Sequence, residues 1–326
     1  MHYRILGSSG LKISEIGYGS WLTVSRSVDL NTTALLVGKA RSLGINFFDT
    51  SDVYNRGGAE ELFGRTLAEF PRHEIVLATK CFFPMGDDVN NRGLSRKHVF
   101  EACHESLKRL RTEYIDLYQC HRYDEETPLD ETCRAMHDLI KQGKVLYWGV
   151  SQWTAPQIVS AVEYCRAHNL HRPISNQPIY NLINRSLEVD VMRVCAMHGL
   201  GNVVYSPLAQ GILTGKYSKG VRPEGSRAAD KTSSQFMEKR MSLDWLDRVD
   251  ALKPIAVAKN ISLAQLSLAW CLRRKEISSV IVGATRKEQL EDNCSAVGVV
   301  FSDDELAAID TVMQTWPVDQ YTGIRL

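Results

Sequence analysis

The sequence contains no long apolar run and no excess of charge of either sign. Its 326 residues include 39 Lys and Arg against 38 Asp and Glu, which gives a formal net charge of +1. Without a basic tract, the composition gives no reason to expect nucleic acid or an acidic membrane as a partner. The start, MHYRILGSSG, has no apolar signal core, and no apolar stretch is long enough to span a bilayer. We therefore expect a cytoplasmic protein without membrane insertion.

Paired cysteines are also absent. The eight cysteines stand at positions 81, 103, 120, 133, 165, 195, 271 and 294, and none belongs to a CxxC pair. Their spacing is too wide for a zinc knuckle. Scattered thiols are typical of a reducing compartment, where most are small buried apolar side chains. The sequence therefore predicts no disulfide, no metal site and a structural role for every cysteine.

What the chain does have is a regular alternation of strand-like and helix-like segments. A hairpin is predicted over Tyr3–Leu6 and Leu11–Ile13. The predicted strands that follow are Glu15–Gly19, Asn46–Asp49, Ile75–Lys80, Ile115–Cys120, Val145–Val150, Ile174–Gln177, Val203–Tyr205 and Val280–Val282. The predicted helices are Asp29–Ser42, Glu60–Leu67, one opened by Ser95, Leu129–Lys141, Pro156–His168 and Glu188–His198. Capping boxes at Ser262–Gln265, Thr285–Glu288 and Ser302–Glu305 start three more helices.

About eight strands, each followed by a helix, favour an α/β fold with a mostly parallel sheet. The number of units indicates a (β/α)₈ TIM barrel with an N-terminal β-hairpin, formed by residues 1–326 as a single domain. A doubly wound sheet is the alternative. The stretch Gly220–Lys239 is polar and aperiodic, and we expect a long loop over the C-terminal face of the barrel.

Four polar side chains stand at the ends of three successive predicted strands. Asp49 ends one strand and Tyr54 follows five residues later, Lys80 ends the next strand, and His121 comes directly after the third. In a barrel the carboxyl ends of the strands share one face, so these side chains can converge. Each alone could be a turn residue or a solvated group, but together they indicate a catalytic site. Asp52, between them, is interpreted as turn chemistry only.

These four groups suit the reduction of a carbonyl. Tyr54 could protonate the alkoxide that forms when hydride attacks, provided that the Lys80 ammonium lowers the pKa of the phenol. Asp49 could compensate the buried charge of Lys80, and His121 could donate to the carbonyl oxygen. No protein side chain donates hydride, so a nicotinamide cofactor is implied.

The same residues carry a resemblance to a known family. Asp49, Tyr54, Lys80 and His121, in GINFFDTSDVY, LATK and YIDLYQCHR, resemble the catalytic tetrad of the aldo-keto reductases. RILGSSGLKISEIGYGSW, YSPLAQGILTGKY and VGATRKEQLEDN extend the resemblance over nearly the whole chain. The segment NRGLSRKHVFEACHESLKRLRTEYIDLYQCHR is similar to the potassium-channel β-subunit branch, which holds bacterial enzymes as well as channel-associated proteins. The resemblance implies a barrel with NADP(H) across its C-terminal face and reduction of a small aldehyde or ketone.

The resemblance also implies a set of cofactor contacts. They are Ser20, Trp21, Asp49, Tyr54, Ser151, Gln177, Tyr205, Ser206, Pro207, Leu208, Gly211, Lys216, Arg227, Gly283, Thr285, Gln289 and Asn293. Among them, Ser151 and Gln177 would contact the carboxamide and Tyr205 would stack on the nicotinamide ring. Arg227 would read the 2′-phosphate that distinguishes NADP(H) from NAD(H), since its planar fork suits a phosphate. Gln152 stands where many members have Asn or Arg, so no role is assigned to it.

Two alternatives to a reductase stay open at this stage. A nicotinamide-binding regulatory subunit of a channel is compatible with the resemblance, although channel-associated members carry Asn where this chain has His121. Hydride transfer is also reversible, so oxidation of alcohols or sugars is the second alternative. The sequence leaves the substrate open, as it does assembly into a homo-oligomer.

Overall fold

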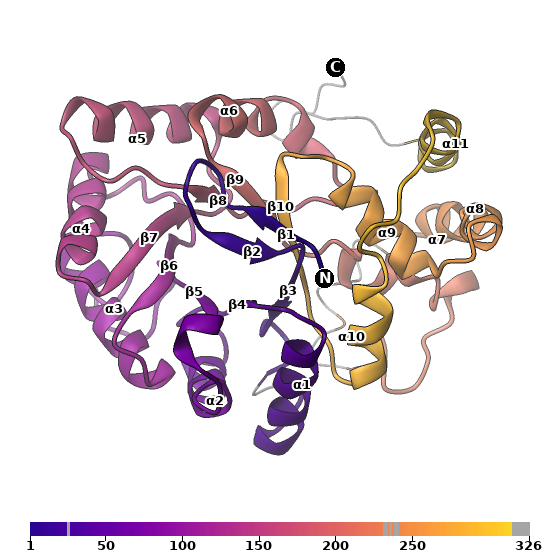
Figure 1. Cartoon of the computed structure of the whole chain (residues 1–326), viewed down its shortest axis with the longest axis horizontal. Coiled ribbons are helices and arrows are strands. Elements are labelled where there is room, and N and C mark those ends of the chain that lie inside the picture. The colour runs from indigo at the N-terminus through magenta and orange to yellow at the C-terminus, as the bar shows by residue number, and fades with distance from the viewer. Residues whose placement is uncertain (25–26, 231–233, 235–236, 238–240, 315–326) are drawn as a thin grey trace.

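Eight parallel strands close into a barrel in the computed structural model of the chain (Figure 1). The structure describes residues 1–24, 27–230, 234, 237 and 241–314. The barrel strands are β3 (Ile16–Gly19), β4 (Phe47–Asp49), β5 (Val76–Cys81), β6 (Ile115–Cys120), β7 (Val145–Val150), β8 (Ser175–Asn176), β9 (Gly201–Val204) and β10 (Ile277–Val282). Each pairs with the next along the chain, and β10 closes the ring against β3. The predicted (β/α)₈ barrel is confirmed, and the doubly wound alternative is wrong.

Helices surround the barrel, as Figure 1 shows. They are α1 (Leu30–Ser42), α2 (Gly58–Leu67), α3 (Arg96–Leu110), α4 (Leu129–Lys141), α5 (Ala155–Ala167), α6 (Val191–His198), α7 (Leu243–Ala251), α8 (Lys253–Ala258), α9 (Leu263–Leu272), α10 (Lys287–Cys294) and α11 (Asp303–Met313). The sequence did not predict α7 and α8, two short helices separated by Leu252, with Pro254 in the first turn of the second. Within the described residues no single helix is long and apolar enough to cross a membrane, although the bent pair Leu243–Ala258 and Leu263–Leu272 passes that test together on length and composition.

Side-chain caps start several of these helices where the sequence predicts them. Ser262 and Ser302 open α9 and α11 with complete capping boxes. The capping box predicted at Thr285 is wrong, because α10 begins at Lys287. There the Gln289 side-chain oxygen accepts the N–H groups of Thr285 at 2.8 Å and of Arg286 at 3.3 Å. Gln289, rather than the predicted Glu288, therefore accepts the backbone N–H groups that precede α10.

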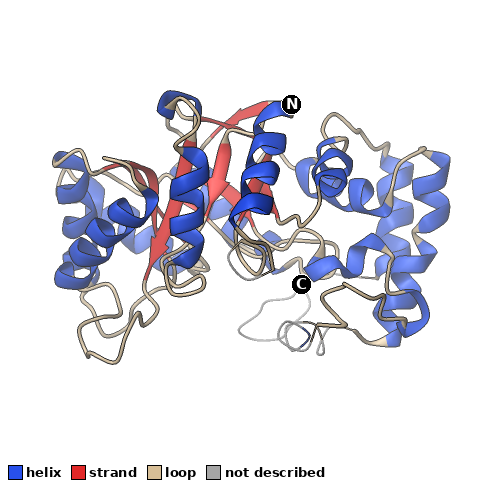
Figure 2. Cartoon of the chain, turned by 90° about the horizontal axis from the view of Figure 1, so that it is seen from below, coloured by secondary structure: helices blue, strands red, loops and turns tan. Residues whose placement is uncertain are grey.

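The N-terminal hairpin covers one end of the barrel. Its strands β1 (Tyr3–Ile5) and β2 (Lys12–Ser14) are antiparallel, as predicted. Arg4 donates from one guanidinium group to the carbonyls of Leu272 at the end of α9, Arg274 in the following loop and Ile277 at the start of β10. Figure 2 shows the N-terminus on one side of the barrel and long connecting loops on the opposite side. The end at which the strands finish is therefore the one left open for a ligand.

The barrel interior is apolar toward the hairpin and polar toward the end at which the strands finish. One cluster of buried apolar side chains joins Leu6 and Ile13 of the hairpin segment to the barrel residues Phe47, Val76, Ala78, Leu117, Val203 and Ile281. Because side chains alternate along a strand, Asp49 points inward like Phe47, and Lys80 points inward like Ala78. Both polar groups are almost completely buried. The strand period thus places a carboxylate and an ammonium at the end of the barrel core where the strands finish.

Two further predictions concern the cysteines and the long loop. Seven of the eight cysteines are buried and Cys294 is half-buried, as expected for small side chains that pack in the core. The first part of the predicted loop, Gly220–Asp230, contains one 3-10 turn that ends at Gly220 and is otherwise irregular. Positions 231–233, 235–236, 238 and 239 of that prediction lie outside the described residues.

Candidate active site

The Lys80 ammonium is the centre of the predicted tetrad. Its Nζ lies 2.7 Å from Asp49 Oδ1, 2.7 Å from the carbonyl oxygen of Thr50 and 3.3 Å from the Tyr54 hydroxyl. The Lys80 side chain is completely buried and that of Asp49 is 4% exposed. Lys80 has three N–H donors, and the structure provides three acceptors for them. Strands β4 and β5 are neighbours in the sheet, so a two-strand contact builds this ion pair.

A sharp loop after β4 brings Tyr54 back over the pair. The Tyr54 N–H donates to Ser51 O at 3.1 Å, and Asn55, Arg56 and Gly57 then all adopt left-handed backbone conformations before α2 begins. Left-handed conformations are costly for residues other than glycine, so the contacts around this turn must hold Asn55 and Arg56 in place. It fixes the phenol at the mouth of the barrel.

The acidity of Tyr54 differs from the prediction. Burial, and next the Asp49 charge, raise the pKa of Tyr54 well above its ordinary value of 10.0. The predicted net lowering of this pKa is therefore wrong: burial dominates, and Asp49, which holds the Lys80 ammonium at 2.7 Å, offsets much of the charge that would favour the phenolate. Burial also lowers the pKa of Lys80, an effect that Asp49 opposes. Tyr54 consequently carries its proton throughout the neutral pH range.

His121 stands beside the phenol, directly after β6. Its ring contacts the rings of Tyr54 and Phe83 edge-on, with centroids 5.8 Å and 4.9 Å away. Its Nδ1 lies 3.1 Å from Ser51 Oγ. Burial, followed by the charges of Lys80 and Arg122, holds the pKa of His121 well below 6.5. His121 is thus a neutral imidazole at pH 7, with a proton on only one of its nitrogens.

Two glutamine side chains fix the second oxygen of Asp49. Gln177 Nε2 donates to Asp49 Oδ2 at 2.8 Å, and Gln119 Nε2 approaches the same atom at 3.4 Å. Ser151 Oγ donates to the backbone carbonyl oxygen of Gln177 at 2.8 Å. The sequence predicted Ser151 and Gln177 as ligand contacts but missed Gln119. An inward-facing glutamine in the strand IDLYQC was the available signal.

The predicted cofactor residues line one cavity of about 1010 Å³. Its wall includes Ser20, Trp21, Asp49, Tyr54, His121, Ser151, Gln177, Tyr205, Ser206, Pro207, Leu208, Gly211, Lys216, Arg227, Gly283, Thr285, Gln289 and Asn293. Lys80 is not on the surface of this cavity, since it lies directly behind Asp49 and Tyr54. The structure therefore gathers all the predicted residues around one volume, with the tetrad at one part of it.

Three cationic side chains meet in another part of the cavity. Lys216, Arg227 and Arg286 all line it. Burial lowers the pKa of Lys216, and the nearby charges of Arg227 and Arg286 lower it further. Like charges that repel one another are an arrangement that a bound anion stabilises. The sequence had not pointed to Arg286, although it directly follows the predicted contact Thr285.

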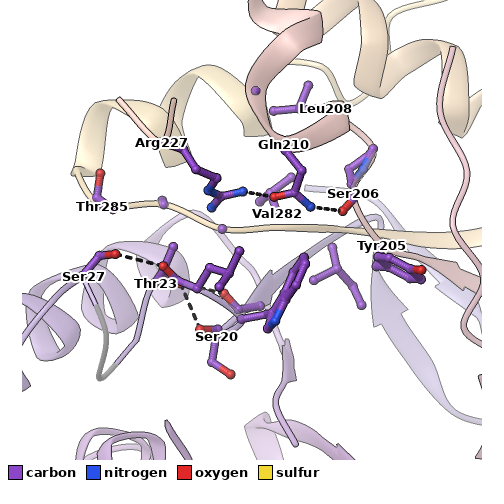
Figure 3. Close-up of a pocket in the computed structure, with 18 of the residues that line it drawn as sticks. Ser20, Thr23, Ser27, Tyr205, Ser206, Leu208, Gln210, Arg227, Val282 and Thr285 are labelled. Atoms are coloured by element: carbon purple, nitrogen blue, oxygen red, sulfur yellow. Dashed lines mark hydrogen bonds between the residues drawn. The ribbon is translucent and has the colours of Figure 1, made fainter. Parts of the chain in front are cut away.

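A hydrogen-bonded chain leads from these cations toward the strand ends. Arg227 donates to the Gln210 side-chain oxygen, and Gln210 Nε2 donates to Ser206 Oγ at 2.6 Å (Figure 3). Ser206 and Gln210 are both in left-handed conformations, with φ of 52° and 63°. Backbone strain of this kind concentrates at ligand sites. The loop after β9 is thus shaped to present polar side chains to the cavity.

One residue without a predicted role also acquires a contact. Gln152 has a left-handed backbone, with φ of 59°, and its Nε2 donates to the Tyr205 hydroxyl at 2.6 Å. This bond fixes the aromatic ring that the sequence predicts at the nicotinamide end. Gln152, after β7, therefore supports Tyr205, after β9, across the end of β8.

Comparison with known proteins agrees with this geometry. Residues 15–314 match the family model described as the aldo/keto reductase family. The chain is 40% identical over 322 residues to a probable voltage-gated potassium channel β subunit of Oryza sativa subsp. japonica, covering 97% of this chain and 98% of that protein. It is 41% identical over 322 residues to a similarly named Arabidopsis thaliana protein, with the same coverage of both chains.

Proposed function

The chain belongs to the aldo/keto reductase family, and on that premise we propose that it reduces aldehydes or ketones to alcohols with NADPH. One observation carries the proposal: a phenol, an ammonium, a carboxylate and an imidazole converge at the mouth of one cavity. Members of this family are oxidoreductases that generally bind NAD(P)H. The choice of NADPH and of a carbonyl substrate are our inferences from the residues of this site.

The residues of the cavity fit a dinucleotide with an additional phosphate. The cavity of about 1010 Å³ reaches from Tyr54 to the group of Lys216, Arg227 and Arg286. Next to Arg227, the buried Ser226 Oγ has no hydrogen-bond partner among the described residues, so a donor is available there. Arg227 and Ser226 would hold the 2′-phosphate, while Ser206 and Lys216 would lie along the other phosphates. When bound, the nicotinamide supplies the hydride.

The chain's own groups then handle one proton and one carbonyl oxygen. Tyr54 keeps its proton at neutral pH, and an alkoxide is a stronger base than a phenolate, so transfer of the phenol proton to the new alkoxide is downhill. The Lys80 ammonium, 3.3 Å from the phenol oxygen, stabilises the phenolate that remains. His121 can donate a hydrogen bond to the carbonyl oxygen and so orient it. A general acid placed in this way contributes about 10²–10⁴-fold to a rate.

The test is steady-state reduction of a panel of aldehydes and ketones with NADPH at pH 7. Tyr54→Phe should lower kcat by about 10²–10⁴-fold while NADPH binding is retained, because the substitution removes only the hydroxyl. Tyr118→Phe is the matched control, since Tyr118 is also buried but does not line the cavity, and its hydroxyl contacts Val99 O at 3.4 Å and the Cys81 thiol. A Tyr54→Phe protein with nearly normal kcat would refute the assignment of the general acid.

A second function is supported by the names of the relatives, which describe probable channel β subunits. In that case the chain would bind the nicotinamide cofactor as a regulatory subunit and turn over little substrate. The same experiment separates the two functions. Tight NADPH binding without reduction of any carbonyl in the panel would favour the regulatory subunit.

A further inference from the structure

A buried carboxyl lies behind the candidate active site, at Asp52. Its side chain is completely buried, although the sequence had suggested only a turn residue. Oδ1 accepts the Val53 N–H at 2.6 Å, as turn chemistry predicts, and it also accepts the Ser51 hydroxyl at 3.0 Å. Oδ2 is buried without any hydrogen-bond partner among the described residues. A buried carboxylate oxygen without a donor favours the neutral acid, whose proton can reside on that oxygen.

Ser51 connects this carboxyl to the imidazole. Its Oγ lies 3.0 Å from Asp52 Oδ1 and 3.1 Å from His121 Nδ1, and its remaining contact is the Lys80 carbonyl at 3.4 Å. The hydroxyl has a single proton to donate. If that proton goes to Asp52, His121 must donate from Nδ1 to Ser51. If it goes to His121 Nδ1, the imidazole must carry its own proton on Nε2.

The charge of Asp52 decides between these two arrangements. An ionised Asp52 is the stronger acceptor and takes the Ser51 proton, which leaves His121 Nε2 without a hydrogen. A neutral Asp52 accepts more weakly, so the Ser51 proton goes to the His121 Nδ1 lone pair. His121 lines the cavity, and its Nδ1 is directed at the buried Ser51, which does not line it, so Nε2 is the nitrogen that His121 can offer to a ligand.

We propose that Asp52 is a positioning residue that acts through Ser51 to select the tautomer of His121, and that only neutral Asp52 gives His121 the N–H that a carbonyl oxygen needs. The inference rests on the proposed reductase function. When Asp52 loses its proton to solvent, the Ser51 hydroxyl rotates, and His121 exchanges its Nε2 proton for one on Nδ1 through solvent. No other bond changes.

The groups around Asp52 leave it free to titrate near neutrality. Those facing it are Glu60 on α2, Arg109 on α3, Lys80 and Cys81 on β5, Tyr118 on β6, and Tyr54 in its own loop. Arg109 is paired with Glu60 and Lys80 with Asp49, so neither cation is available to compensate Asp52 alone.

The pKa values of Asp52 and its neighbours agree with these contacts. Burial, and next the Glu60 charge, raise the pKa of Asp52 to about 7. Around pH 7 His121 stays neutral, because its pKa lies well below 6.5, and Tyr54 stays protonated, because its pKa lies well above 10.0. Asp52 is therefore the group near His121 whose charge changes around pH 7, and that change alters the tautomer rather than the charge of the imidazole.

The first measurement needs no turnover. Nitrogen-15 NMR of histidine-labelled protein reports which ring nitrogen of His121 carries the proton, and the signal is assigned by its loss in His121→Asn. We expect the wild type to carry the proton on Nε2 at pH 6 and on Nδ1 at pH 8.5. Asp52→Asn cannot ionise and should keep the Nε2 proton at both pH values. A wild-type tautomer that does not change with pH would overturn the proposal.

The second measurement is the pH profile of carbonyl reduction. Wild-type kcat should fall about tenfold for each pH unit above about 7, whereas kcat of Asp52→Asn should stay level to pH 8.5. Ser51→Ala removes the hydroxyl between Asp52 and His121, so it should also abolish the fall of kcat above about pH 7, although Asp52 is intact. Asp116→Asn is the matched control, a second buried aspartate, which pairs with Arg72 away from the cavity and should keep the wild-type profile. An unchanged profile in both Asp52→Asn and Ser51→Ala would overturn the proposal.

The two experiments separate this proposal from the function on which it rests. Wild-type protein that reduces no carbonyl at any pH would refute the reductase function, and the NMR signals would still decide whether Asp52 selects the tautomer. An active wild type with a pH-independent tautomer would refute the role of Asp52 alone.

Discussion

Replacement of Arg227 by alanine tests how this site would distinguish NADPH from NADH. Arg227 lines the cavity together with Lys216 and Arg286, and its guanidinium donates to Gln210. The 2′-phosphate would give this cation a charge-assisted hydrogen bond, and such bonds contribute about 1.5–3 kcal/mol. At about 1.4 kcal/mol for each factor of ten, the Kd for NADPH should rise about tenfold to a hundredfold. The Kd for NADH should hardly change, because NADH lacks the phosphate.

The assay is a titration of each cofactor into wild type and variant, followed by quenching of tryptophan fluorescence. Arg222→Ala is the matched control, because Arg222 lies in the same loop, is exposed and does not line the cavity. It should leave both Kd values unchanged. An equal loss of NADPH and NADH affinity in Arg227→Ala would show that this residue does not read the phosphate. A wild-type preference for NADH would refute the choice of NADP itself.

Three further predictions concern stability. Lys80→Met leaves the Asp49 carboxylate buried without its cation, so the unfolding free energy in urea should fall by about 3–5 kcal/mol and turnover should nearly vanish; a protein of normal stability would contradict the buried pair. Gly64→Ala places a Cβ 2.3 Å from the Arg109 carbonyl oxygen and should cost about 1–3 kcal/mol, whereas Gly38→Ala, with nothing within 4 Å, should lower neither the Tm nor the urea midpoint. The pKa of Asp52 in the folded protein, about 7, exceeds its ordinary value of 3.8, so the protonated carboxyl favours the folded state. This contribution to the unfolding free energy is complete below about pH 4 and is lost as the pH rises to about 7, by at most about 4 kcal/mol. Urea titrations of Asp52→Asn should not show this loss.

The sequence by itself determined the barrel and the place of its chemistry. Regular alternation of strands and helices predicts a closed parallel sheet, and the carboxyl ends of its strands must then lie on one face. Asp49, Lys80 and His121 are each at or directly after a strand end, so their convergence follows from chain order alone. Resemblance to a family supplied the residues around the cofactor, and the structure places all of them around one cavity.

Only the tertiary structure decided how these groups are tuned. The pKa of a phenol or carboxyl depends on how much water its surroundings exclude, and sequence does not show that burial for Tyr54 or Asp52. The grouping of Lys216, Arg227 and Arg286 depends on how three loops pack together, which no periodicity encodes. Asp52 shows the difference most clearly. The residue type, its place in a turn and its nearness to Ser51 are visible in the sequence, but the link from Ser51 to His121 exists only because β4, β5 and β6 are neighbours in the closed barrel.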